Sequence, residues 1–166
     1  TEDAAETAGA NLGMVGTVRR DTAASSAGTT GDNATLNTDE LGRLWVREGN
    51  PCGDHARITS AAIDTAASGN VEIVALTASN LIYLCGYSVV VDAAVDIQFI
   101  YGTGTACATG ETNLTGAWGF AANGGITQAN GGAVQFVVPS GNAFCIETSG
   151  AIQTSGHVTY VKTAAP

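Results

Sequence analysis

Short runs of apolar residues, separated by Gly, Asn and Ser, recur along the chain from residue 56 to residue 162. In one such run Val71, Ile73 and Ala75 fall on one side of an extended chain, which is the two-residue period of a strand. No stretch of ten or more residues has a helical period, so the pattern predicts an all-β protein. The expected strands are 56–63, 70–77, 81–91, 95–101, 114–121, 133–138, 143–148 and 157–162.

Eight short strands joined by glycine-rich turns favour a jelly-roll-like β-sandwich. Several of these strands are apolar on both faces, as where Ile97 and Phe99 alternate with Gln98 and Ile100. One apolar face suits packing against a second sheet. The other suits a partner or an arm that lies on the outside.

The first fifty residues differ in composition from the rest of the chain. No aromatic residue occurs before Trp45, and Ala, Thr, Gly, Ser, Asn and Asp dominate residues 1–44. Because such a segment cannot bury enough apolar surface to fold alone, we expect an extended arm over 1–50, with a short strand at 42–47. The turn-rich segment 50–54 leads into a sandwich domain at 51–166.

Charge narrows the range of partners. The net charge of −9 arises from 15 acidic and 6 basic residues. A surface that binds phosphates needs clustered Lys and Arg, so we expect no nucleic-acid partner, and the same argument disfavours an anionic membrane. The longest apolar stretch, 81–91, is shorter than the about 18 residues of a transmembrane helix. The acidic start, 1–6, does not resemble a signal peptide, so we expect that a signal was removed or never used.

The four cysteines, Cys52, Cys85, Cys107 and Cys145, are widely spaced and form no C-x-x-C pair, so we expect no zinc site. In an oxidising compartment they would form two disulfides, and buried free thiols are the alternative. Of the three pairings, we favour Cys52 with Cys107, because both lie in loop-like surroundings. Cys85 would then pair with Cys145 from facing strands.

The sequence contains no convincing catalytic or metal-binding motif. No serine lies in a G-x-S-x-G turn, and nothing brings a serine towards His55 or His157, so we expect that the protein is not an enzyme. Asp92 and Asp96 flank a turn with too few neighbouring oxygens for calcium. We therefore expect no metal and no cofactor.

Two aromatic residues, Trp118 and Phe120, alternate with glycines in the segment 115–120. Such a pair can form a platform on which a sugar ring stacks. Core packing is the stronger expectation, because large aromatic side chains dominate the interiors of small domains.

Segments in both parts of the chain resemble structural proteins of tailed bacteriophages. In the arm they are Val18-Arg19-Arg20-Asp21-Thr22-Ala23-Ala24-Ser25, Gly31-Asp32-Asn33-Ala34-Thr35-Leu36-Asn37 and Gly42-Arg43-Leu44-Trp45-Val46. They follow the form R-x-D-x-x, then G-D-x-A-x-L, then G-x-L-x-V. In the domain the similar segments are 82–87, 101–110 and 141–146, so the resemblance spans most of the chain.

The resemblance implies a protein displayed on a virion, with a jelly-roll-like domain and an arm that reaches the next subunit. Our leading expectation is a capsid decoration (cement) protein that bridges capsid subunits. Its partners would be the major capsid protein and further copies of itself, as a homotrimer. The arm residues expected at these contacts are Val18, Arg19, Arg20, Asp21, Leu36, Arg43 and Trp45.

Two other functions stay open. A fibre or tail-appendage protein would bind a host receptor or glycan through Trp118 and Phe120. A secreted hydrolase on a jelly-roll scaffold would need one of the histidines or acids for catalysis.

Overall fold

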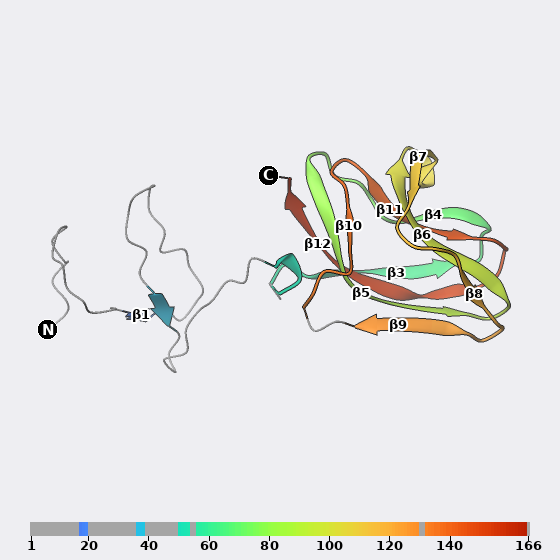
Figure 1. Ribbon diagram of the computed structural model, residues 1–166, viewed down its shortest axis with the longest axis horizontal. Helices are drawn as coiled ribbons and strands as arrows, with labels where there is room; N and C mark the ends of the chain where they lie inside the picture. The colour runs from blue at the N-terminus through green and yellow to red at the C-terminus, as the bar shows by residue number, and fades with distance from the viewer. Residues whose placement is uncertain (1–16, 20–35, 39–49, 54–55, 130–131, 166) are drawn as a thin grey trace, which may run out of the picture. The chain divides into compact units, whose positions relative to one another are not determined.

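The computed structural model describes residues 17–19, 36–38, 50–53, 56–129 and 132–165 (Figure 1). The chain divides into two compact units, residues 1–47 and 48–166. Among the described residues no helix is both long enough and apolar enough to cross a membrane.

In the first unit two short strands, β1 (Thr17–Arg19) and β2 (Leu36–Thr38), pair in parallel. Thr17 lies opposite Leu36, and Arg19 lies opposite Thr38. This pairing was not predicted from the sequence. The strand predicted at 42–47 lies outside the described residues.

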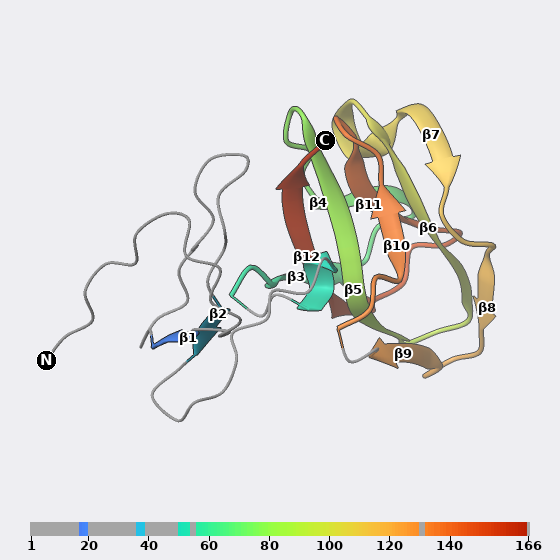
Figure 2. The same cartoon turned by 60° about the vertical axis from the view of Figure 1, so that its left-hand side comes forward.

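The described residues of the second unit form ten strands and two single-turn 3₁₀ helices. In chain order they are η1 (Pro51–Gly53), β3 (Thr59–Thr65), β4 (Gly69–Val74), β5 (Asn80–Val91), β6 (Val95–Thr103), η2 (Thr105–Cys107), β7 (Thr109–Asn113), β8 (Trp118–Phe120), β9 (Gly125–Ala129), β10 (Phe136–Val138), β11 (Ala143–Thr148) and β12 (Thr154–Ala164). The strands form two sheets. Figure 2 shows the side of the domain along which the chain runs through β7, β8, β9 and β10.

The first sheet has the order β10-β5-β12-β3, with β9 also paired to β5, and the second has the order β4-β11-β6-β7, with β8 also paired to β6. All pairs are antiparallel and nested along the chain: β3 with β12, β4 with β11, β5 with β9 and β10, and β6 with β7 and β8. This nesting is the topology of a jelly roll, so the predicted fold class is confirmed.

Each of the eight predicted strands also overlaps a strand of the structure, if two consecutive strands along the same sheet edge are counted as one. β7 and β8 together form one edge strand, and β9 and β10 form another. The sequence did not predict β7 or β9, because β7 is exposed along its whole length and β9 has only one half-buried residue, Ile126. The strand predicted at 114–121 shortens to β8, because Leu114 and Thr115 lie in a bend and the strand begins only at Trp118.

The core lies between the two sheets and is centred on aromatic side chains. Phe99 contacts Tyr87, Trp118 and Phe144 edge-to-face, with ring centroids 5.0 to 5.1 Å apart. A register shift in the β5–β12 pairing leaves Cys85 without a direct partner on β12. Ile82 and Leu84 before the shift, and residues 87, 89 and 91 after it, therefore all face the core.

Candidate functional site

Both sheets carry a disulfide on the face that points away from the core. Cys52 of η1 is bonded to Cys85 of β5, with their Cα atoms 5.4 Å apart. Cys107 of η2 is bonded to Cys145 of β11, with their Cα atoms 6.3 Å apart. The expectation of two disulfides holds, but the favoured pairing of Cys52 with Cys107 and of Cys85 with Cys145 is wrong.

The pairing follows from the positions of the two strand cysteines. Cys85 packs with Val161 outside the first sheet, whereas Cys145 packs with Ala143 and Ile100 outside the second. Packed sheets lie about 10 Å apart, and the Cα atoms of a disulfide must lie within about 7 Å of each other. Cys85 and Cys145 are therefore separated by the whole sandwich, and each bonds to the 3₁₀ helix on its own side.

Each disulfide closes a small apolar cluster that is separate from the main core. The first contains Cys52, Cys85 and Val161, with Ile58, Tyr83 and Val134 packed against it. The second contains Ile100, Cys107, Ala143 and Cys145, all fully buried. The domain's own turns thus cover part of the second apolar face that the sequence assigned to a partner or an arm.

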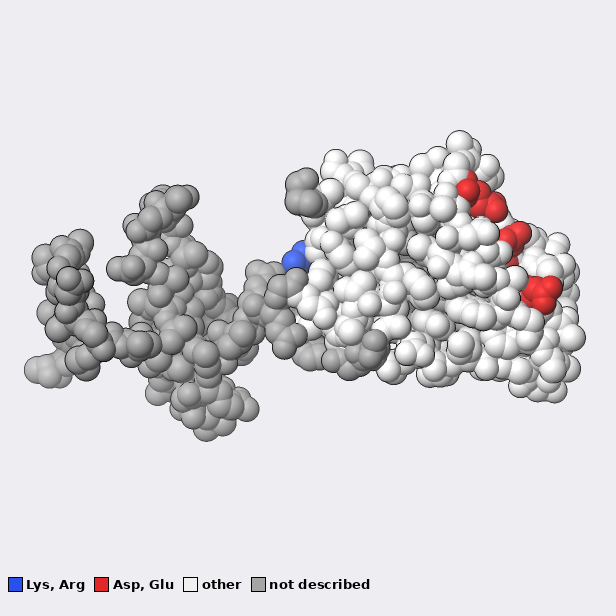
Figure 3. Space-filling model, viewed as in Figure 1, with Lys and Arg blue, Asp and Glu red and all other residues white. Residues whose placement is uncertain are grey.

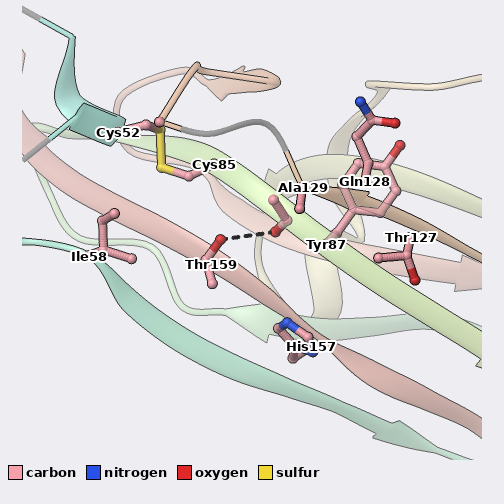
Figure 4. Close-up of a pocket in the computed structure, with 11 residues that line it drawn as sticks. Cys52, Ile58, Cys85, Tyr87, Thr127, Gln128, Ala129, His157 and Thr159 are labelled. Atoms are coloured by element: carbon pink, nitrogen blue, oxygen red, sulfur yellow. Dashed lines mark hydrogen bonds between the residues drawn. A yellow bond between two sulfur atoms is a disulfide. The ribbon is translucent and has the colours of Figure 1, made fainter. Parts of the chain in front are cut away.

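A hollow of about 350 Å³ lies beside the first disulfide, over β5, β9 and β12 (Figure 4). In the figure the disulfide stands at one end of the hollow and His157 of β12 at the other. Thr159 Oγ1 donates a hydrogen bond to the carbonyl oxygen of Gly86 across the floor, at 3.3 Å. No sequence pattern indicates this hollow, because it depends on which residues of three strands share the outer face.

The outer face of the first sheet has small side chains beyond this hollow. The strand register places Ser88 of β5 directly opposite His157, and Ala62 of β3 on the other side of the histidine. Ser88 Oγ hydrogen-bonds to Thr127 Oγ1 at 3.0 Å. The β5–β12 register thus places a serine next to His157, which the sequence did not indicate, and the serine hydroxyl is hydrogen-bonded to a threonine. His55 lies outside the described residues.

Trp118 and Phe120 both pack against the main core, and the intervening Gly119 is exposed. The Trp118 ring stacks on Tyr87, with centroids 5.8 Å apart, and meets Phe99 edge-to-face. The half-buried indole thus has two aromatic partners inside the domain. Burial also raises the pKa of the Tyr87 phenol, because desolvation disfavours the phenolate.

Figure 3 shows acidic side chains on one side of the domain and a cationic group towards the other end. The strands of the second sheet contain the acidic residues Glu72, Asp96, Glu111 and Glu147. Lys162 Nζ donates to the carbonyl oxygen of Ala75, at 2.7 Å. Within the described part of the chain, no group of three or more His, Cys, Asp or Glu residues could hold a metal ion.

The residues predicted at arm contacts belong to the first unit. Val18 and Arg19 lie in β1, and Leu36 lies in β2, so the β1–β2 pairing brings these segments of the sequence together. Arg20, Asp21, Arg43 and Trp45 lie outside the described residues.

Comparison of the chain with protein-family models, curated proteins and solved structures found no match.

Proposed function

We propose that the chain is a structural protein of a virus particle, of the capsid-decoration kind. The observation that carries the proposal is the division of the chain at residue 47 into a first unit poor in apolar residues and a jelly roll with two disulfides. In this proposal the first unit attaches the protein to capsid subunits, and the jelly roll is displayed on the outside. The resemblance of segments within 18–46 to phage virion proteins supports the same assignment.

The surface of the jelly roll suits close contact with neighbours. In the row formed by Thr127, Ser88, His157 and Ala62, every side chain except that of His157 is short, which allows another backbone to approach closely. A long run of unpaired backbone groups along a sheet edge can pair with strands of other molecules and cause aggregation. The interruption between β7 and β8 and the interruption between β9 and β10 shorten such runs. We therefore propose contacts with further copies in a homotrimer and with the major capsid protein.

The disulfides suit a protein that functions outside the cell. All four cysteines are paired, and such bonds persist in oxidising surroundings. The proposed location is the particle surface, where the bonds form after assembly and release.

A fibre or appendage protein that binds a glycan is the less favoured proposal. It would use Trp118 and Phe120, and both rings already pack against the core. A sugar would have to displace Tyr87 or Phe99 from Trp118 in order to stack there.

The test compares three forms of the protein for binding to capsids from which this chain has been removed. The full chain should restore occupancy, as imaging of the particles would show, and a 45–166 truncation should melt normally yet fail to bind. A 17–166 form, which keeps β1 and β2, is the matched control for loss of chain length. Normal occupancy by the 45–166 form would rule out attachment through the first unit. Failure of the full chain to bind would rule out decoration.

A further inference from the structure

The segment that joins the two units meets the jelly roll at η1, before the first strand of the domain. Cys52 is fully buried and bonded to β5, whereas β3 begins only at Thr59. Asn50 Nδ2 adds a hydrogen bond of 2.6 Å to the carbonyl oxygen of Gly132. The chain is therefore fixed to the domain before it reaches β3.

The first strand alone would be a weak attachment point. β3 is an edge strand that pairs only with β12, and its first residue Thr59 lies opposite Tyr160. Ile63 is its one fully buried side chain. Tension applied at the free end of such a strand breaks its ladder one residue pair at a time.

The strand that receives the disulfide is better held. β5 pairs with β12 from Asn80 to Val91 and, along its other side, with β9 and β10. Cys85 lies in the middle of β5, so a pull at this point has no free strand end to peel. Core side chains flank it on both sides, with Leu84 fully buried and Tyr87 nearly so.

We propose that the Cys52–Cys85 disulfide is a mechanical anchor that carries tension from the first unit into the central strand β5 and bypasses the edge strand β3. The anchoring is a property of the jelly roll itself. Only its use on a particle, where the displayed domain would be held through residues 1–47, rests on the proposed function.

The β5–β12 register determines how this tension acts on the sheet. When the two chain ends are pulled, force reaches β12 at Ala164, opposite Asn80, and reaches β5 at Cys85. The residue pairs from Leu84–Tyr160 to Asn80–Ala164 lie between these points. The two points are offset along the strands, so these pairs are sheared together instead of opening in turn.

Single-molecule pulling on the full chain, held at its two ends, tests the anchor. Forced unfolding is governed by the unfolding rate, and we expect Cys52→Ala/Cys85→Ala to lower the unfolding force of the jelly roll by about a factor of two. The variant should also release the loop closed by the disulfide, which has a sequence separation of 33, and this lengthens the extension by about 120 Å at roughly 3.6 Å per residue.

The matched control is Cys107→Ala/Cys145→Ala. Its loop of 38 residues is similar in length, so the loss of loop-closure stabilisation is similar, but the bond does not join the N-terminal segment to the domain. We expect a longer extension, by about 140 Å, and a smaller drop in force. An equal drop in both variants, or none in the first, would overturn the proposal.

A second measurement leaves every cysteine in place. A protease site is inserted after Gly53 and cut in the folded, oxidised protein, so that the N-terminal fragment is held by the Cys52–Cys85 bond and no longer by the backbone. If the disulfide carries the tension, the cut and uncut proteins unfold at the same force. A lower force after cutting would mean that β3 had carried it, and the anchor would be wrong.

The pulling measurements and the capsid-binding test can overturn their two proposals independently of each other. A chain that does not bind capsids but unfolds as described keeps the anchor and loses the decoration function. A chain that decorates capsids but unfolds at the same force without the first disulfide keeps the function and loses the anchor.

Discussion

The two sheets of the jelly roll carry the same device on their outer faces, a 3₁₀ helix bonded to a central strand, but they place it differently along the chain. On the first sheet, η1 precedes every strand of the domain, and its cysteine bonds forward to β5. On the second sheet, η2 lies inside the β6–β7 connection, and its cysteine bonds to β11. The first bond fixes the point where the chain joins the domain, and the second fixes an internal loop.

The two helices also differ in backbone conformation. In η2, Ala106 and Cys107 have φ values of 50° and 61°, a left-handed conformation that is unfavourable for residues other than glycine. No residue of η1 has a positive φ among those that the structure describes. The second disulfide thus holds a strained turn, whereas the first holds an unstrained turn.

Removing either disulfide should have the largest effect on stability. Loop-closure entropy predicts a loss of about 4 kcal/mol for each of Cys52→Ala/Cys85→Ala and Cys107→Ala/Cys145→Ala, because the loops span 33 and 38 residues. Urea unfolding measures both. A difference of more than about 2 kcal/mol between the variants would mean that native-state strain, and not loop length, sets their contributions.

A single substitution tests the pairing. In Cys52→Ala alone, the thiol released for alkylation should be Cys85, as mass spectrometry of the labelled peptide would show. Labelling of Cys107 would restore the pairing that the sequence favoured.

Close backbone contacts at one glycine in each sheet should give the next largest effects. A Cβ at Gly156 of β12 would collide with the carbonyl oxygen of Ser88, so Gly156→Ala must separate two central strands. We expect a loss of about 3 kcal/mol or more. At Gly102 the nearest atom, the carbonyl oxygen of Cys107, is 2.6 Å away in a connecting loop, so we expect about 1 to 2 kcal/mol.

Gly116→Ala is the control for these glycines, because no atom lies within 4 Å of its added Cβ. Thermal unfolding of the three variants gives the comparison. A larger loss at Gly102 than at Gly156 would mean that the β6–β7 connection is more rigid than the β5–β12 pair.

The sequence was sufficient for the fold class because the strands that define it are strongly apolar. β5, β6 and β11 bury most of their residues, and their predicted limits agree with the structure to within two residues at each end. The sequence was not sufficient for the edges, where β7 has the polar sequence TGETN and is exposed throughout. The conformation of an edge strand depends on its pairing with the neighbouring strand, and the residue pattern of one strand contains no information about that neighbour.

The candidate site was harder to predict than the fold for the same reason. The pairing of Cys85 depends on which sheet β5 joins and which face the cysteine occupies, and the register shift at Cys85 changes that face locally. The positions of Ser88 and His157 opposite each other likewise depend on the β5–β12 register. These are relations between strands, and they follow from the topology only once it is known.

Trp118→Ala should have an intermediate effect on stability. It distinguishes a role of Trp118 in the core from a role in receptor binding. The ring is half-buried between Tyr87 and Phe99, so we expect a loss of about 2 kcal/mol, less than for a fully buried tryptophan. Val90→Ala, on the exposed face of the first sheet, should change stability little. Normal stability of the Trp118 variant together with lost binding to host cells would favour the appendage function.

The strained turn of the second sheet predicts a small gain in stability. Ala106→Gly relieves the left-handed conformation at φ 50° and should stabilise the domain by up to about 1 kcal/mol. Ala108→Gly, at φ −68°, is the control and should be neutral or destabilising. Denaturant midpoints measure both, and equal loss in the two variants would mean that the turn is not strained.

The smallest predicted effect concerns Tyr87, where the first sheet meets the aromatic residues of the second. Because burial raises the pKa of its phenol, the folded protein keeps the proton to higher pH than the unfolded chain, which releases it near pH 10. This contribution to stability is present below pH 10 and is lost as the pH rises through the folded-state pKa. Tyr87→Phe should therefore flatten the fall in melting temperature between pH 9 and pH 11, measured at rates that leave the disulfides intact. Tyr160→Phe leaves Tyr87 in place, so the melting temperature of this variant should fall with pH as that of the wild type does. An equal flattening in both variants would show that Tyr87 is not the responsible group.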